Sequence, residues 1–403
     1  MDTYFLSPFS TITKKKKGYG ISSLMEPKKE VYIDSLRELV PENKKLLDFI
    51  FFKRTNKNIA DYMENSLEKL EKLFKKQKTT AGYIETTKNC PYHCQICPKS
   101  WDRQNRMNIQ MSVDNFEKII KQIPKGETIA LHLFGDPLFD KDLFQKIAIA
   151  NDYGIIPSFS TNLVSLLRID ITKFIGLKLN TLIISFDSYE EQILSKIRGH
   201  ISHKQIDKAK IILKELDELA DNYKFVKHIE IQQIMLKNNS EEKDKLVKFA
   251  ESGKKMIFVP KKYINFPLVD SCEIGTQEIV NIDEKILLYR VIGQRTPFLC
   301  LKPWIKKEIG ITTDGKVVPC CLSLNATANI GNAFDMSLNE IFRSKAHEKF
   351  RKEIFFNTIS QDNYTCKNCN VYKQQAIISG LSDKAFYNLK KYVIPSWSVY
   401  NEN

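Results

Sequence analysis

The sequence predicts an α/β protein: a partial, TIM-like (β/α)6 barrel with a helical N-terminal extension and a small cysteine-rich C-terminal domain. Between residues 80 and 265, strand-like apolar runs alternate with helical patterns, and such alternation is typical of a parallel sheet with right-handed crossovers. The nine cysteines gather near residue 90 and beyond residue 270. A composition of 42% hydrophobic and 11% aromatic residues is that of an ordinary globular protein.

Residues 1–79 are expected to form the helical extension, because residues 30–78 fit helical spacing. In "SLEKLEKLFKKQK", one stripe carries the apolar residues Leu67, Leu70, Leu73 and Phe74. A helix with such a stripe packs against a larger body. We recognise no convincing set of three strands in this region.

Residues 80–270 are expected to form the barrel. The strand candidates are 81–87, 128–135, 155–162, 181–187, 228–236 and 255–263. Helical stretches separate them, such as 114–123 with its isoleucines and Phe116 on one face. Several polar clusters follow directly after strand ends, which is where α/β folds place their active sites.

The charge balance is basic, with 62 Lys and Arg against 48 Asp and Glu. Such a surplus can attract nucleic acid or anionic lipid. However, only Lys14–Lys17 form a block, so we favour a solvated surface and expect no nucleic-acid partner.

No apolar run is long enough to span a bilayer. The N-terminus also lacks the charge order of a secretory signal. We therefore expect a cytoplasmic protein without a membrane partner, and in that compartment clustered cysteines more often bind metal than form disulfides.

The stretch "KNCPYHCQICPKS" places Cys90, Cys94 and Cys97 directly after the first barrel strand. Thiolates are soft ligands that suit zinc or an iron–sulfur cluster. A closed site of either kind needs four protein ligands, and no fourth cysteine lies nearby. Three thiolates on a [4Fe–4S] cluster leave one iron open, which favours a catalytic cluster over a structural one.

In this position, C-x₃-C-x₂-C resembles the signature of the radical SAM (S-adenosylmethionine) enzymes. "LHLFGDPLFD" resembles the family's G-G-E-P motif, "SFSTN" the segment after the third strand, and "IISFDS" with "KIRG" the fourth-strand region. The resemblance covers roughly residues 80–265. It implies these residues for binding S-adenosylmethionine: Gly135, Asp136, Ser160, Asn162, Ser185, Asp187 and Arg198. The chain departs from the family pattern at Phe134 and Asp136, where the family often has Gly and Glu, and at Ile96, where an aromatic residue is common.

Residues 271–403 resemble the C-terminal extension called SPASM, or its shorter form, twitch. The resemblance implies a closed auxiliary [4Fe–4S] site with four thiolate ligands: Cys300, Cys320, Cys366 and Cys369. A full SPASM domain carries two auxiliary clusters and needs more cysteines than remain, so a single auxiliary cluster is favoured. Cys321 is then a bystander or a thiol near the cluster, and Cys272 is a buried or free thiol with no role. Taken alone, the four cysteines also fit a zinc ribbon.

The resemblance implies an enzyme whose open iron chelates the methionine amino and carboxylate groups of S-adenosylmethionine. An external one-electron donor, such as a flavodoxin or ferredoxin, then supports cleavage to methionine and a 5′-deoxyadenosyl radical. That radical takes hydrogen from a substrate carbon, while the auxiliary cluster accepts an electron or helps to bind the substrate.

Three readings of the function remain open. A small molecule that is oxidised or rearranged is preferred, because the N-terminal region shows no strand trio of the kind that captures a leader peptide. The alternative is a maturase of a peptide or protein. A zinc- or nucleic-acid-binding protein without redox chemistry is the third reading.

Overall fold

The computed structural model describes most of residues 4–262 and 300–359, together with Cys366. Within these ranges it leaves out residues 7–9, 15–16, 24–25, 35–43, 46–50, 54–55, 95, 98–109, 200, 237–238, 301, 324–325 and 357. Cys272 and Cys369 therefore lie outside the described residues. None of the described helices is long and apolar enough to cross a membrane.

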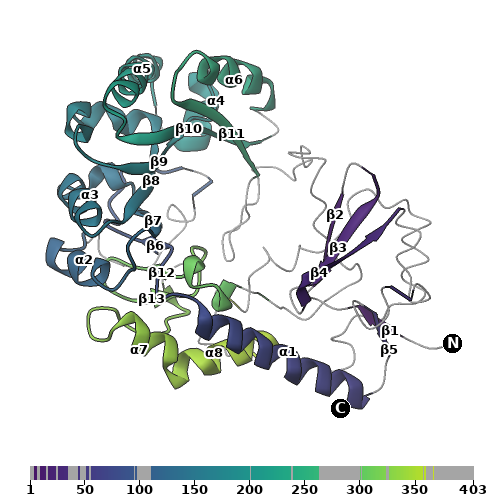
Figure 1. Cartoon of the computed structure of the whole chain (residues 1–403). Coiled ribbons are helices and arrows are strands. Elements are labelled where there is room, and N and C mark those ends of the chain that lie inside the picture. The colour runs from purple at the N-terminus through teal and green to yellow at the C-terminus, as the bar shows by residue number, and fades with distance from the viewer. Residues whose placement is uncertain are drawn as a thin grey trace.

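The centre of the molecule is an eight-stranded sheet with the strand order β11-β10-β9-β8-β7-β6-β12-β13. Its first six strands are β6 (Tyr83–Ile84), β7 (Thr128–Ala130), β8 (Ile156–Asn162), β9 (Leu179–Ser185), β10 (Val226–Met235) and β11 (Met256–Lys262). Neighbours among these six pair in parallel. All six predicted strands are present, although β6 and β7 are shorter than the predicted 81–87 and 128–135. The order along the sheet is that of a partial (β/α)6 barrel (Figure 1).

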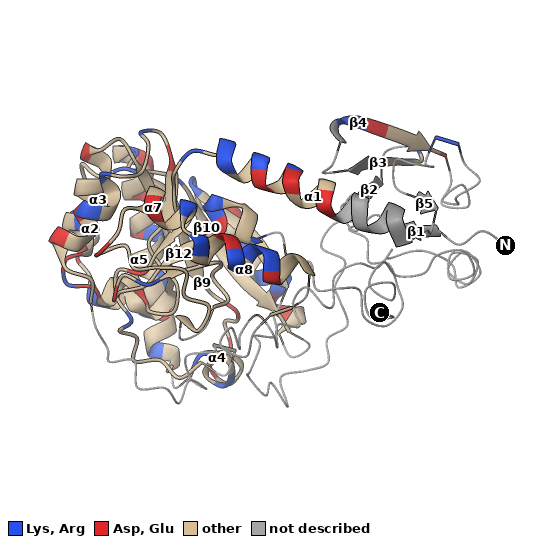
Figure 2. Cartoon of the chain, turned by 90° about the horizontal axis from the view of Figure 1, so that it is seen from below, with Lys and Arg blue, Asp and Glu red and all other residues tan. Residues whose placement is uncertain are grey.

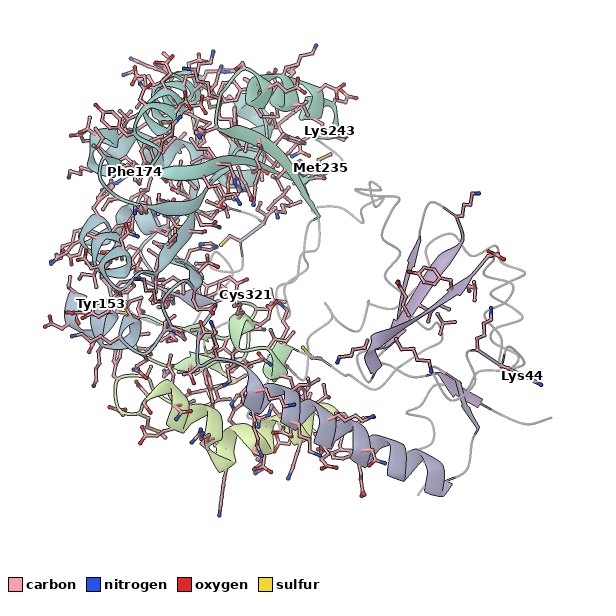
Figure 3. All side chains as sticks on the ribbon, in the orientation of Figure 1. Lys44, Tyr153, Phe174, Met235, Lys243 and Cys321 are labelled. Atoms are coloured by element: carbon pink, nitrogen blue, oxygen red, sulfur yellow. The ribbon has the colours of Figure 1, made fainter. Side chains whose placement is uncertain are left out.

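Helices cover the outer face of these strands (Figure 1). They are α2 (Val113–Ile120), α3 (Leu143–Asp152), α4 (Glu191–Arg198), α5 (His203–Tyr223) and α6 (Lys243–Glu251), with short 3₁₀ turns at η3 (Pro137–Phe139), η4 (Leu163–Arg168), η5 (Ile171–Phe174) and η6 (Ser240–Glu242). Phe159 of β8, Phe174 and Phe225 stack in the buried layer between strands and helices. Phe174 lies among the outer elements in Figure 3, away from Met235 and Cys321. Since strand side chains alternate between faces, the neighbours of Phe159 on β8 point into the barrel.

The C-terminal region extends the barrel sheet. β12 (Gly310–Ile311) pairs in parallel with β6, and β13 (Val317–Val318) turns back antiparallel to β12. Gly315 makes the turn with φ of 81°, a conformation that favours glycine. The remaining described elements are η7 (Lys302–Trp304), η8 (Lys306–Glu308), α7 (Leu338–Arg343) and α8 (Lys345–Phe356). This segment therefore continues the barrel instead of forming a detached lobe.

The prediction of a wholly helical N-terminal extension is wrong. β2 (Ser10–Lys14), β3 (Tyr19–Ser23) and β4 (Glu26–Ile33) form an antiparallel three-stranded sheet, and β1 (Tyr4–Leu6) pairs with β5 (Phe51–Lys53). Only α1 (Asn56–Lys76) confirms the expected helix. The strands are short, so their stability comes from cross-strand pairing and from burial of side chains such as Ile21 and Ile33. Local periodicity does not report such contacts.

Helix α1 runs from this N-terminal sheet to the main body, as Figure 2 shows. The second half of α1 packs against α7 and α8: Phe74 meets Phe342 and His347 edge to face. Glu71 accepts two hydrogen bonds from Arg351, at 2.7 and 2.6 Å. The domain boundaries at 79/80 and 270/271 stay a prediction, since α1 and the C-terminal region share one core cluster with the barrel.

Candidate active site

The cysteine loop begins where β6 ends, at the edge of the sheet that holds the carboxyl ends of the strands. Cys94 is buried, whereas Cys90 and Cys97 are half-buried. Cys94 Sγ donates to the backbone oxygen of Arg198 at 3.3 Å, and Ile96 packs in a buried cluster with Cys94, Ile197 and Leu236. The end of α4 and the end of β10 therefore hold the loop in place. Burial raises the pKa of the Cys94 thiol to about 11, so the neutral thiol is the form present until a metal displaces its proton.

The donor set of this loop fits an iron–sulfur cluster. Within the described ranges, no three His, Cys, Asp or Glu side chains gather closely enough to hold one metal ion. A [4Fe–4S] cluster makes a different demand, because each thiolate binds its own iron. Three thiols on one short loop, backed by an apolar cluster, meet that demand.

Gly135 fits closely beneath this loop. A Cβ placed on Gly135 would lie 1.9 Å from the backbone oxygen of Thr87, which leaves no room for any side chain. The next residue, Asp136, donates its backbone N–H to the oxygen of Asn89 at 3.0 Å. The segment after β7 therefore supports the segment that leads into the cysteines.

The carboxylate of Asp136 is fully used by the protein. Its oxygens accept hydrogen bonds from Leu138 N, Thr161 Oγ1, Asn162 N and Ser165 Oγ, at 3.1, 2.7, 3.1 and 2.7 Å. Four bonds occupy the lone pairs that a carboxylate offers. Burial raises the pKa of Asp136, although these bonds favour its ionised form. Its geometry is that of a positioning residue between the ends of β7 and β8.

Asn162 offers a donor that the described protein does not use. Its Oδ1 accepts from Val164 N at 3.2 Å and caps η4, whereas its Nδ2 is buried and has no partner among the described residues. Asn162 pairs in register with Ser185 of β9, and Ser160 lies two residues before it on the same strand face. Since buried donors are normally satisfied, the Nδ2 group fits a bound polar ligand such as S-adenosylmethionine.

Asp187 and Arg198 form a buried ion pair. Asp187 Oδ2 accepts from Arg198 Nε at 2.5 Å, and its Oδ1 accepts from Ile234 N at 2.7 Å. The Arg198 side chain also hydrogen-bonds the Cys94 thiol. A guanidinium carries five N–H donors, so Arg198 keeps donors that can bind a ligand carboxylate.

Polar side chains on the inner wall of the barrel were not singled out from the sequence. His228 Nε2 lies 3.3 Å from Thr181 Oγ1 and 3.4 Å from Glu230 Oε1, while Gln232 donates to Glu230 at 2.7 Å. His132 accepts from Ser160 N at 3.1 Å, and burial lowers its pKa to about 4, which keeps it neutral. The alternation of polar and apolar residues in "HIEIQQIML" is the signal that could have identified this wall.

The C-terminal thiols lie beside the barrel. Cys300 is buried in the main core cluster and Cys366 packs against it, while Cys320 follows β13. Cys321, labelled in Figure 3, is hydrogen-bonded to the hydroxyl of Tyr83 on β6. Burial raises the pKa of the Cys321 thiol. Whether Cys321 is a ligand therefore stays a prediction.

Two family models match the chain. The model of the radical SAM superfamily matches residues 84–252, and that of the SPASM iron–sulfur cluster-binding domain matches residues 300–370. The PqqA peptide cyclase of Bradyrhizobium diazoefficiens is 25% identical over 139 residues, which are 32% of this chain and 36% of the relative. That of Granulibacter bethesdensis is 21% identical over 290 residues, 66% of this chain and 75% of the relative. The first match thus spans only about a third of its relative.

Solved structures show the same fold. SuiB of Streptococcus suis bound to S-adenosylmethionine aligns with a TM-score of 0.50 at 14% identity, over 86% of this chain and 90% of that one. SuiB bound to the precursor peptide SuiA aligns with a TM-score of 0.51 at 12% identity, over the same shares. The cysteine loop, the strand-end residues and both family models agree: the chain belongs to the radical SAM superfamily and carries a SPASM domain in residues 300–370.

Proposed function

We propose that this protein reductively cleaves S-adenosylmethionine and uses the resulting radical to take a hydrogen atom from a carbon of a peptide. The cluster, when bound, supplies the single electron that breaks the carbon–sulfur bond. The chain's residues hold the reactants and keep the radical from other partners. The preference for a small-molecule substrate depended on a helical N-terminal region, and that premise is not met.

The roles of the site residues follow from their hydrogen bonds. Cys90, Cys94 and Cys97 would hold the catalytic cluster. Arg198 would bind the carboxylate of S-adenosylmethionine with its remaining N–H donors, and Asn162 Nδ2 would donate to a polar group of the same molecule. Ser160 and Ser185 line the strand ends beside it, whereas Gly135, Asp136 and Asp187 shape and orient the site. The ligands of one auxiliary cluster would be Cys300, Cys320, Cys366 and Cys369.

The observation that carries the peptide proposal is the antiparallel sheet of β2, β3 and β4. β3 is its central strand, so β2 and β4 are its edges. An edge strand can pair with an extended peptide through backbone hydrogen bonds. The relatives named PqqA peptide cyclase and the SuiB structure that holds a precursor peptide support the same reading.

The test starts with anaerobic reconstitution with iron and sulfide, followed by reduction and measurement of 5′-deoxyadenosine. We expect wild type to produce it and the Cys94→Ala variant to lose it, because Cys94 would hold one iron. Cys272→Ala is the matched control and should remain active. Cleavage of S-adenosylmethionine by Cys94→Ala at the wild-type rate would contradict the proposal.

The substrate class needs its own comparison in the same assay. Synthetic copies of short peptides encoded beside the gene should raise 5′-deoxyadenosine formation and lose hydrogen, as seen by mass spectrometry. Amino acids and sugars of similar composition serve as the small-molecule arm. Hydrogen loss from that arm alone would favour the small-molecule alternative.

A further inference from the structure

A shallow groove lies on the outer surface where η4 meets α5. Leu167, Ile211 and Ile212 supply its apolar lining, and Lys204 and Lys208 supply its charge. Ile211 is 59% exposed, which is unusual for so large an apolar side chain. An exposed apolar patch with a charged rim is typical of a surface that binds another protein.

Two sets of contacts connect this groove to the cysteine loop. In the first, the end of α4 touches the loop: Arg198 O accepts from Cys94 Sγ at 3.3 Å, and a Cβ on Gly199 would lie 3.3 Å from His93 N. The link from α4 to α5 is tight, because Ser195 Oγ donates to Ile201 O at 2.8 Å and accepts from Ile201 N at 3.1 Å. α5 starts two residues later, at His203.

The second set runs through η4. Arg168, next to Leu167, lies over the ring of Phe139 at 4.2 Å. Phe139 in turn meets Tyr92 of the cysteine loop, with ring centroids 6.1 Å apart. Both routes consist of a few direct contacts, so the elements that line the groove are linked to the cysteine loop.

The charge of this surface is positive. Lys204 and Lys208 stand four residues apart on α5, and neither has an ion-pair partner among the described residues. The nearby acid Asp207 is paired with Lys210 at 3.0 Å. Glu191 is also close, and its carboxylate accepts from His203 N at 2.6 Å. The lysines at the groove are thus left to interact with a partner.

We propose that this groove docks an acidic electron-carrier protein that supplies the electron for S-adenosylmethionine cleavage. The proposal rests on the proposed function. The carrier is oxidised by one electron, and S-adenosylmethionine is reduced as its carbon–sulfur bond breaks to give methionine and the 5′-deoxyadenosyl radical. Electron transfer weakens steeply with distance, which favours a surface beside the cluster loop. Opposite charges steer a transient partner to a small interface.

The test compares two reductants on the reconstituted holoenzyme. Dithionite is small and needs no docking surface, whereas reduced flavodoxin is an acidic protein. The Lys204→Glu/Lys208→Glu variant should form 5′-deoxyadenosine about tenfold more slowly with flavodoxin at low salt, since removing rim charges lowers the association rate. Its rate with dithionite should equal that of wild type. Lys204→Arg/Lys208→Arg should keep both rates.

A charge-matched control is Lys69→Glu/Lys76→Glu on α1, far along the chain from the groove. Equal slowing of this control with flavodoxin would show that overall charge matters and would overturn the docking surface. An unchanged flavodoxin rate in the groove variant would also overturn it, as would equal loss with both reductants. Wild type that forms no 5′-deoxyadenosine with dithionite would instead contradict the proposed function itself.

Discussion

At the scale of single residues, the site separates groups that face a ligand from groups that hold the site together. Asp136 has four donors on its carboxylate, and Asp187 has two. Asn162 instead keeps a buried amide nitrogen that no described residue uses. Arg198 bonds Asp187 and Cys94 and still keeps N–H donors for a ligand. The sequence placed Asp136, Asn162 and Asp187 at or just after strand ends, and the structure has them there. It could not distinguish contact from positioning, because that depends on hydrogen bonds between distant segments.

This distinction makes opposite predictions for two conservative variants. Arg198→Lys keeps the charge but loses the planar two-point donor, so the KM for S-adenosylmethionine should rise about tenfold or more, the equivalent of one charge-assisted hydrogen bond. Asp136→Asn should leave this KM near that of wild type and lower the melting temperature instead. Both quantities are measurable on reconstituted protein. A larger KM effect from Asp136→Asn than from Arg198→Lys would reverse the assigned roles.

At the scale of elements, strand β10 divides its residues between two environments. Ile229 and Ile231 are buried against helices, and between them Glu230 faces the interior with His228 and Gln232 on the same side. Glu230 also pairs in register with Ile183, which pairs with Ser160. The carboxylate therefore lies in the same row as a predicted cofactor residue, where a substrate would meet it.

The Glu230→Gln variant tests this inner wall. It preserves size and hydrogen bonding but removes the charge, so we expect peptide-dependent hydrogen loss to fall about tenfold. Cleavage of S-adenosylmethionine without peptide should continue, because the cofactor residues are untouched. Glu218→Gln on the exposed side of α5 is the matched control. If both activities fall together, Glu230 serves cofactor binding or stability instead of the substrate.

The elements that the sequence predicted well are those whose signal is local. Strands β8, β9 and β10 run for seven, seven and ten residues, and strands of this length separated by helical stretches are recognisable from sequence alone. The N-terminal strands are short, and β4 even begins "EP", where proline is tolerated because the strand is at an edge. Because these strands carry little local signal, the predicted helical region was extended upstream to residue 30, although α1 begins at Asn56. The spacing of the auxiliary cysteines is informative in the sequence. Their full set cannot be compared with the structure, because Cys369 lies outside the described residues.

At the scale of the whole molecule, α1 is the connection between the N-terminal sheet and the enzyme body (Figures 1 and 2). Its 21 residues span about 30 Å at 1.5 Å per residue. Glu71 and Phe74 fix the second half of α1 to α8. Glu71 accepts from Arg351 of α8, and the Arg351 guanidinium lies 4.1 Å from the centroid of the Phe74 ring. A peptide bound at the sheet would therefore be held at a defined distance and direction from the barrel.

Arg351→Met should loosen this connection. The Arg351 and Glu71 side chains are 3% and 14% exposed, and breaking a buried pair leaves an uncompensated charge that costs about 3–5 kcal/mol of unfolding free energy. Urea unfolding under anaerobic conditions should show the loss as a lower midpoint. Lys352→Met breaks the exposed Lys352–Glu348 pair on the same helix and should change the midpoint little, because exposed pairs contribute little.

Below the unfolding range, Arg351→Met should lose peptide-dependent turnover before it loses S-adenosylmethionine cleavage, since α1 positions the peptide and the barrel alone holds the cofactor. Parallel loss of the two activities would mean that α1 supports the barrel itself and does not act as the arm that presents the peptide.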